Sequence, residues 1–397
     1  MSLNVHRRVL VLATTVFIIS ACGRNGMAPS NAFNASKTSI QGSNADSSGA
    51  APTDTTSILK LLKKDVTIGS TVDPTNGDMG PRAVTVVQSN FGKLKKGQLL
   101  VCNFENSSGT AGEGTTIEQF DAVANSKPTT FFQNSKIEGC DGDAIDGGDQ
   151  VYATGFTSKV MVRINQKGQL KKTYDSPVTQ PLGDGEGPML YDYSPELVFI
   201  GNADTGGVDS FRFGGYSSGH GKEVIDGFDV NKGSGWSALG PSGIAYWCGV
   251  LPGTGECPSK NHPPDTLYVV DGACNTVAAI SHASKLQVKD EITVQPGCKK
   301  FTCMYRSITC VTVVKAGSPL DKPVAETLLP NGNLIVANTG SNMLVEMTPK
   351  GQVLDTEIID KSKTSGIFGL AAIGTKDSNT RLFYTDTNTN TLQELEQ

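Results

Sequence analysis

The sequence predicts an all-β protein, a six-bladed β-propeller of four-stranded antiparallel blades with disulfide-stapled insertions. Short apolar runs alternate with polar turns, and glycine is abundant at 45 of 397 residues, which favours short strands and frequent turns over long helices. A polar residue closes a similar apolar strand at six places, with intervals of 51, 48, 69, 67 and 48 residues: Asn103, Thr154, Asn202, Asp271, Asn338 and Asp386. A repeat of this length indicates propeller blades, with two enlarged units.

The amino-terminal residues have the features of an export signal. Arg7 and Arg8 precede an apolar run at residues 9–19, which is too short to span a membrane. The run leads into an Ile-Ser-Ala-Cys motif that ends at Cys22 and resembles the lipobox of bacterial lipoproteins. The resemblance implies that residues 1–21 are a lipoprotein signal peptide and that Cys22 carries lipid, with an acyl chain such as palmitate on its amino group, which anchors the protein to a membrane.

Residues 22–56 are expected to form a flexible tether. Ser, Asn, Ala, Gly and Thr dominate this stretch, and such a composition buries too little apolar surface to offset the chain entropy lost on folding. Gly23 follows the cysteine, whereas an aspartate there resembles an inner-membrane retention signal. We therefore expect an outer-membrane anchor in the cell envelope, with the propeller in the periplasm or at the cell surface.

Net charge limits the classes of partner. The formal charge of −5 becomes −7 after loss of residues 1–21, because that segment carries Arg7 and Arg8 and no acidic residue. Phosphate-rich partners need compensating lysine and arginine, so the sequence argues against nucleic acid as a partner. The oligomeric state is left open.

The propeller domain is expected at residues 57–397. Its second strands end at the six closing residues and cover 98–103, 149–154, 197–202, 267–271, 333–338 and 382–386. Third strands are expected after the polar turns, at 116–120, 160–164, 208–211, 276–280, 343–345 and 391–395.

Closure of the ring requires one more strand. The sixth unit ends two residues after Leu395, whereas in the fifth unit residues 353–359 can add an outer strand. An unpaired sheet edge invites aggregation, so another segment should cover it. The β-rich run at 65–72 is the natural candidate, which makes 57–72 the expected closing segment.

Three turns resemble those of a known repeat family. Residues 270–277, 337–344 and 385–392 are similar to the Ala-Asp-Thr-Gly-Asn-Asn-Arg-Ile pattern of NHL-repeat propellers, although the arginine is absent. The resemblance covers roughly residues 65–397 and is strongest in the last three units. It implies a six-bladed propeller whose ligands bind at the mouth of the central channel.

Eight further cysteines are disulfide candidates in an exported chain. They allow 105 pairings, of which only the local pair Cys248–Cys257 is suggested by its Gly/Pro-rich loop. A metal site at Cys298, Cys303 and Cys310 is the less favoured alternative, because no Cys-x-x-Cys spacing is present. The eight are Cys102, Cys140, Cys248, Cys257, Cys274, Cys298, Cys303 and Cys310.

Candidate ligand-binding residues lie at the starts of innermost strands and in the loops before them. Aligned by repeat, they are Arg82, Asp143, Glu186, Ser242, Glu326 and Phe368. His220 lies in a glycine-rich stretch, expected to be a surface loop, and is a candidate general base. No residue is assigned a catalytic role.

Calcium is the one cofactor the sequence makes conceivable, and none is assigned. The recurrent Asn and Asp residues are interpreted as structural, because short polar side chains accept local backbone hydrogen bonds in turns. The acidic run at 141–149 superficially resembles a calcium loop but lacks the terminal glutamate of an EF-hand, and is expected to be a solvated loop.

These observations favour a membrane-tethered, extracytoplasmic propeller that acts as a binding or scaffold module for a protein, peptide or glycan ligand. The alternative is a metal-assisted lactone hydrolase or a lyase, similar to gluconolactonases and streptogramin lyases. Clustered Glu, Asp and Asn ligands in the channel would favour the enzyme.

Overall fold

The computed structural model describes residues 54–146, 148–175, 196–213, 220–231, 239–248, 265–286, 290–304 and 310–397. The chain divides into two compact units, Met1–Gly42 and Ser43–Gln397, and all described residues belong to the second. Of the lipidation, ligand-binding and disulfide candidates, Cys22, Glu186 and Cys257 lie outside the described ranges, as do Arg7, Arg8 and Gly23 of the export signal. Within those ranges, no helix is long and apolar enough to cross a membrane.

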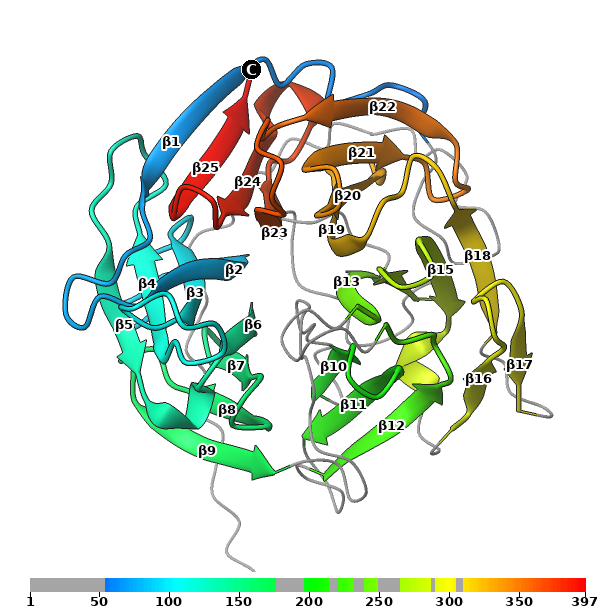
Figure 1. Ribbon diagram of the computed structural model, residues 1–397, viewed down its shortest axis with the longest axis horizontal. Helices are drawn as coiled ribbons and strands as arrows, with labels where there is room; N and C mark the ends of the chain where they lie inside the picture. Colours follow the sequence, from blue (N-terminus) through cyan, green and yellow to red (C-terminus); the bar gives the residue numbers. More distant parts are fainter. Residues whose placement is uncertain are drawn as a thin grey trace, which may run out of the picture. The chain divides into compact units, whose positions relative to one another are not determined.

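The described strands form six sheets around a central axis, which confirms the predicted all-β six-bladed propeller (Figure 1). Blade 1 contains β2 (Met79–Val86), β3 (Leu99–Glu105), β4 (Thr116–Phe120) and β5 (Thr129–Gln133). Blade 2 contains β6 (Cys140–Ile145), β7 (Val151–Gly155), β8 (Val160–Ile164) and β9 (Leu170–Asp175). Blade 3 contains β10 (Glu196–Asn202), β11 (Gly207–Phe213) and β12 (His220–Asp226), followed by β16 (Ile292–Val294) and β17 (Phe301–Cys303).

The other three blades follow the same outward order. Blade 4 contains β13 (Pro241–Trp247), β14 (Thr266–Asp271), β15 (Thr276–Ser281) and β18 (Val311–Ala316). Blade 5 contains β19 (Pro323–Leu328), β20 (Leu334–Asn338), β21 (Met343–Met347) and β22 (Val353–Ile358). Blade 6 contains β23 (Ile367–Ile373), β24 (Arg381–Asp386), β25 (Thr391–Glu396) and β1 (Lys64–Ser70). Single 3-10 turns lie at Ser135–Ile137, Ala283–Lys285 and Asp377–Asn379.

The second strands are apolar on both faces because each blade packs between two others. In β20, Leu334 and Val336 join a cluster with Trp247 and Tyr268 of blade 4. Their neighbour Ile335 joins a cluster with residues of blade 6. Successive side chains of a strand point to opposite faces, so a strand buried on both sides has an almost continuous apolar sequence.

Blade 6 is completed by a strand from the beginning of the domain. β1 pairs antiparallel with β25, with Lys64 opposite Glu396 and Ser70 opposite Thr391. The carboxyl-terminal strand therefore lies between β24 and β1 (Figure 1). The pairing covers the edge that the sixth repeat would leave open.

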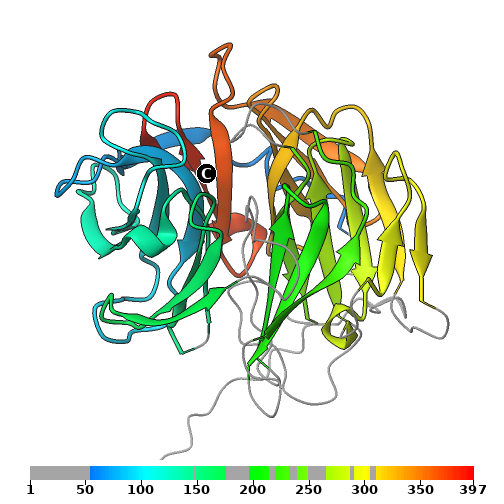
Figure 2. The ribbon, with the colours of Figure 1, turned by 60° about the horizontal axis from the view of Figure 1, so that its bottom comes forward.

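The insertion between β15 and β18 extends a neighbouring blade. Its strands β16 and β17 lie on the outside of blade 3, where β16 pairs parallel with β12 (Figure 2). Disulfide Cys274–Cys298 joins the turn between β14 and β15 to the turn between β16 and β17, and Cys303–Cys310 joins the end of β17 to the residue before β18. Cys102–Cys140 joins blades 1 and 2. Cys248 is also disulfide-bonded. The disulfide interpretation of the cysteines is thus confirmed for the described residues.

Candidate functional site: the axial pocket

Five of the six innermost strands begin with an irregularity, and β10 is the exception. In β2, β6, β13, β19 and β23 the pairing register with the second strand shifts close to the first residue of the strand. Such bulges change the direction of side chains, which in a regular strand point alternately to the two faces of the sheet. Arg82, Asp141, Ser242, Val324 and Phe368 lie at these shifts.

Four of these strands enclose a small pocket close to the axis. Its walls come from β2, β6, β19 and β23, and its cavity volume is about 30 Å³. The lining residues are Arg82, Ala83, Val84, Asp141, Asp143, Val324, Ala325, Phe368, Gly369 and Leu370. We call this site the axial pocket. It brings together three candidates predicted from the sequence, namely Arg82, Asp143 and Phe368.

Arg82 is fixed on one side of the axial pocket. Its guanidinium carbon lies 3.7 Å from the ring centroid of Phe368 and 4.3 Å from that of Phe104. Burial raises the pKa of Glu105, and the positive charge of Arg82 partly offsets this rise, so the two groups interact electrostatically. Stacking and charge together hold the guanidinium in place.

The backbone of Arg82 is tied to blade 6. Thr385 Oγ1 donates to the Arg82 carbonyl oxygen at 3.1 Å and accepts from the Gly369 N–H at 2.7 Å. A Cβ atom at Gly369 would lie 2.5 Å from the same carbonyl oxygen. Glycine therefore permits the close approach of β23 to β2 that shapes this wall.

Asp141 and Asp143 form the acidic wall of the axial pocket. They are 2% and 1% exposed, and none of their four carboxyl oxygens has a hydrogen-bond partner among the described residues. Burial raises the pKa of Asp143 well above its ordinary value. The expectation of a solvated loop at 141–149 is wrong, because residues 140–145 form the innermost strand β6 and are packed between blades.

Two further candidates lie on innermost strands outside the pocket lining. Ser242 on β13 is buried and its Oγ has no partner among the described residues. Glu326 on β19 is fully buried, and burial raises its pKa well above the ordinary value, partly offset by the backbone N–H of Ala245. Neither Glu326 carboxyl oxygen accepts a hydrogen bond of normal geometry. Both residues add unsatisfied oxygen atoms around the axis.

His220 is not part of this site. It was expected in a surface loop, but it is the first residue of β12 and pairs with Arg212 of β11. β12 is the third described strand of blade 3, outward of β10 and β11, so its backbone is remote from the innermost strands that form the axial pocket.

The recurrent turn residues make local contacts. Asp271 Oδ1 accepts hydrogen bonds from the N–H groups of Ala273 and Cys274 at 2.8 and 3.2 Å, and Asp386 Oδ1 accepts one from Asn388. These bonds stabilise the turns between second and third strands, as short polar side chains do in such positions.

The described part of the chain contains two groups of at least three acidic or cysteine side chains close enough to share a metal ion, and both lie outside the axial pocket. One consists of Glu223, Asp226 and Asp290. The other combines Asp229 with Cys274 and Cys298. The carboxyl oxygens of Asp141 and Asp143 do not belong to such a group, so the described channel residues do not fit a calcium centre with three or more acidic ligands.

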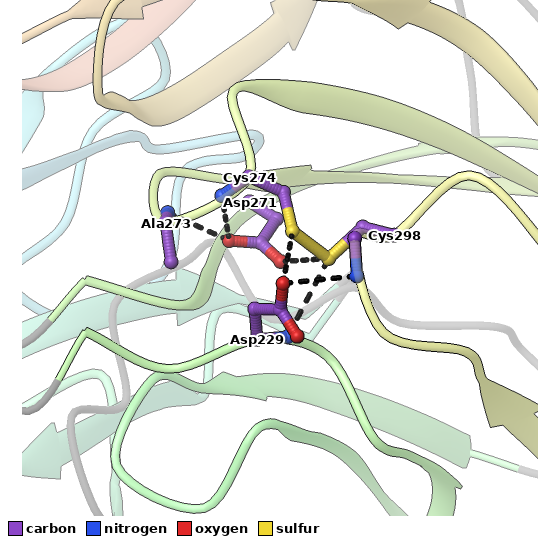
Figure 3. Close-up of a disulfide and its surroundings, with 6 residues drawn as sticks. Asp229, Asp271, Ala273, Cys274 and Cys298 are labelled. Carbon is purple, nitrogen blue, oxygen red and sulfur yellow. Dashed lines mark hydrogen bonds between the residues drawn. A yellow bond between two sulfur atoms is a disulfide. The ribbon is translucent and has the colours of Figure 1, made fainter.

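The second group is built around a disulfide rather than free thiols (Figure 3). Asp229 Oδ2 lies 3.2 Å from Cys274 Sγ, and Asp271 Oδ2 lies 3.1 Å from Cys298 Sγ. Burial raises the pKa of Asp271 to about 7, although the N–H groups of Cys274 and Ala273 oppose the rise. Metal binding needs thiolates, so the oxidised pair is a structural staple of the insertion.

Sequence reasoning missed Asp141, Phe104 and Glu105. Regular alternation predicts that Asp141 and Asp143 share a face, but the register shift between Cys140 and Gly142 makes alternation unreliable here. Phe104 and Glu105 lie at the end of a second strand, where the repeat pattern gives no sign that they surround an arginine from the neighbouring strand. The run of acidic residues around Asp141 was the one available signal.

Comparisons with known proteins agree on the fold. Neither a protein-family model nor a curated protein matches the sequence. A gluconolactonase from Xanthomonas campestris is similar at 11% identity and a TM-score of 0.52, over 89% of this chain and 95% of the other. A second structure, provisionally named a gluconolactonase, has 12% identity and a TM-score of 0.52, over 87% and 97%. The virginiamycin B lyase of Staphylococcus aureus has 15% identity and a TM-score of 0.46, over 84% and 98%. Identities this low establish a shared propeller fold and nothing about chemistry.

Proposed function

We propose that this protein is a binding module, held at a membrane surface, that takes one group of a protein, peptide or glycan ligand into the axial pocket. The observation that carries the proposal is the pair Asp141 and Asp143, buried in the pocket wall with four carboxyl oxygens that have no partner among the described residues. A buried polar group left without a hydrogen bond costs roughly 1–3 kcal/mol. A ligand or water that supplies donors would remove this cost.

The position of the pocket supports the same role. Four blades contribute to its walls, and the fixed guanidinium of Arg82 and the ring of Phe368 give it one cationic and one aromatic wall beside the acidic one. Ligand sites often combine an apolar surface with a few precisely placed polar groups in this way. The rigid sheets hold these groups in register without a ligand.

The enzyme alternative has support at the level of the fold alone. The gluconolactonase likeness has 11% identity. Among the described residues, the channel also lacks the ligand cluster that metal-assisted lactone hydrolysis would need. We therefore assign no catalytic residue.

Binding of the purified full chain to peptide and glycan arrays tests the proposal. A ligand that enters the axial pocket should lose most of its signal when Val324→Phe fills the space and when Asp141→Asn removes an acceptor. The matched control is Val353→Phe on β22, the outer strand of blade 5, which should bind like the wild type. A ligand unaffected by both pocket variants would place binding elsewhere and contradict the proposal.

A further inference from the structure

The size of the axial pocket restricts what can enter it. A cavity needs about 10–15 Å³ of volume measured in this way to hold one water molecule, so the cavity volume of about 30 Å³ has room for about two. A group about as large as water, such as a primary ammonium, fits this space. A sugar ring or an aromatic side chain is several times larger and would remain outside.

The hydrogen-bonding character of the pocket is that of an acceptor. Asp141 and Asp143 offer four carboxyl oxygens, none of which receives a hydrogen bond from the described residues. An ammonium group has three N–H donors and no acceptor, so it complements such a wall. Hydrogen bonds between an ammonium and a carboxylate are also stronger than those between neutral groups.

The charges around the pocket also favour a cationic ligand group. Arg82 is stacked between Phe368 and Phe104, and it interacts with the carboxyl group of Glu105 on the adjoining strand. The remaining lining residues of β2, β19 and β23 are uncharged. Asp141 and Asp143 are thus the acidic groups of the lining, and neither forms an ion pair with a described cation.

We propose that the axial pocket binds a primary ammonium group, presented by a lysine side chain or by the amino terminus of a peptide or protein partner. This inference rests on the proposed binding function and narrows its ligand to a cationic group of a polypeptide. The ammonium lies against the carboxyl groups of Asp141 and Asp143, and the rest of the partner lies over the mouth of the channel.

Binding by this mode is linked to protons. Burial raises the pKa of Asp143 well above its ordinary value, which favours the protonated form of its carboxyl group in the empty pocket. An ammonium stabilises the ionised form, and Asp143 then releases a proton when the ligand binds. Among the described lining residues, the other titratable or charged groups are Arg82 of β2 and Asp141 of β6. Affinity therefore rises with pH until the ligand amine itself loses its proton, near pH 10.4 for lysine.

The experiment uses the full chain and a matched pair of probes, Nα-acetyl-lysinamide and the same compound acetylated on its side-chain nitrogen. Isothermal titration at pH 6 and pH 8 should show binding of the charged probe alone, with higher affinity at pH 8 and proton release detected by changing the buffer. Asp141→Asn and Asp143→Asn should each weaken binding about tenfold or more. Asp355→Asn, on the outer strand β22, is the matched control and should leave affinity unchanged.

The possible results separate this inference from the proposed function. Equal binding of the two probes, or a glycan whose binding is lost in Asp143→Asn, would overturn the ammonium inference and leave a binding module. Saturable binding of calcium alone that is lost in Asp143→Asn would identify a metal site instead. If no peptide, amine or glycan binding responds to the pocket variants, the proposed function is wrong as well. Because one variant alone could fail to fold, each is first compared with the wild type by circular dichroism.

Discussion

Glu118 on β4 is fully buried. Its neighbour Asp73 lies in the turn that leads from β1 into blade 1. Asp73 Oδ1 accepts hydrogen bonds from the N–H groups of Thr75 and Asn76, and its Oδ2 accepts one from Thr130 Oγ1. Burial alone would raise the pKa of Asp73, but these bonds and one with Glu118 lower it. Burial, with the hydrogen bond to Asp73 and the charge on that residue, raises the pKa of Glu118 to about 10. Glu118 is therefore protonated at neutral pH and donates to Asp73.

Substitution of Glu118 by glutamine should flatten the dependence of stability on pH. The folded pKa of about 10 exceeds the unfolded value near 4.3, so the folded state binds more protons and wild-type stability falls as pH rises between these two values. Glutamine keeps the donor and does not titrate. Melting at pH 5 and pH 9 should show a smaller fall for Glu118→Gln than for the wild type, by about 2 °C or more. The exposed Glu113→Gln is the control, and an equal fall in all three proteins would contradict the assignment.

At the scale of elements, the segment before blade 1 binds to blades 5 and 6. The buried carboxylate of Glu346 on β21 accepts hydrogen bonds from Ser57 Oγ at 2.7 Å and from the N–H groups of Ile58 and Leu59 at 3.1 and 2.8 Å. Ile58 and Leu59 are themselves fully buried in a cluster shared by blades 5 and 6. β1 follows and pairs along β25. The exposed ion pair between Lys64 and Glu396 adds little to this attachment.

Deletion of residues 57–72 should destabilise the propeller. The deletion exposes the edge of β25, leaves the buried Glu346 without its donors from Ser57, Ile58 and Leu59, and removes the apolar contacts of the segment. We expect a fall in melting temperature of several degrees and an increase in aggregation, measured by differential scanning fluorimetry and light scattering. Deletion of residues 31–46, a segment of equal length, controls for chain length. Melting like that of the wild type would show that ring closure does not depend on this segment.

At the scale of the whole molecule, the propeller follows residues 22–56 in the chain. We propose that this segment tethers it to a membrane. The proposal rests on the lipobox resemblance at Cys22, which the described residues do not include. An acyl chain contributes about 0.8 kcal/mol per buried CH₂, so two or three chains suffice for stable attachment. A channel mouth held near a membrane would meet partners of the cell envelope.

Replacement of Cys22 by serine should release the protein from membranes. In a Gram-negative host, labelled palmitate should enter the wild type and not Cys22→Ser, and fractionation should move the variant to the soluble fraction. Gly23→Asp keeps the acceptor cysteine and should stay membrane-bound but shift to the inner membrane. Membrane association of Cys22→Ser equal to that of the wild type would contradict lipid anchoring.

Much of the fold could be predicted from local patterns. The second strands and their polar turns are visible because each is an apolar run closed by Asn, Asp or Thr, and strand and turn preferences act over a few residues. The predicted outer strand at 353–359 corresponds to β22. Pairing between distant segments is harder, since β16 joins β12 of another blade through only two register pairs, Ile225–Ile292 and Asp226–Thr293. No local pattern specifies such a contact.

The residues of the axial pocket could be predicted only in part from local sequence patterns. The repeat aligned Arg82, Asp143 and Phe368 with the channel because residues at equivalent repeat positions occupy equivalent places in the blades. It could not show that Asp141 joins them, because a bulge in β6 changes where side chains point. Nor could it choose among the 105 cysteine pairings, which depend on distances across the folded chain.

The amino-acid sequence determined the blade count, the strand positions and the turn chemistry of this protein, because hydrophobic periodicity and turn preferences are properties of short segments. The tertiary structure decided which strand extends which blade, which cysteines meet and which carboxyl groups lose contact with water. The properties of Asp141 and Asp143 come from this loss of contact with water. Burial between blades, and not the residue type alone, leaves their oxygens without partners among the described residues and raises the pKa of Asp143.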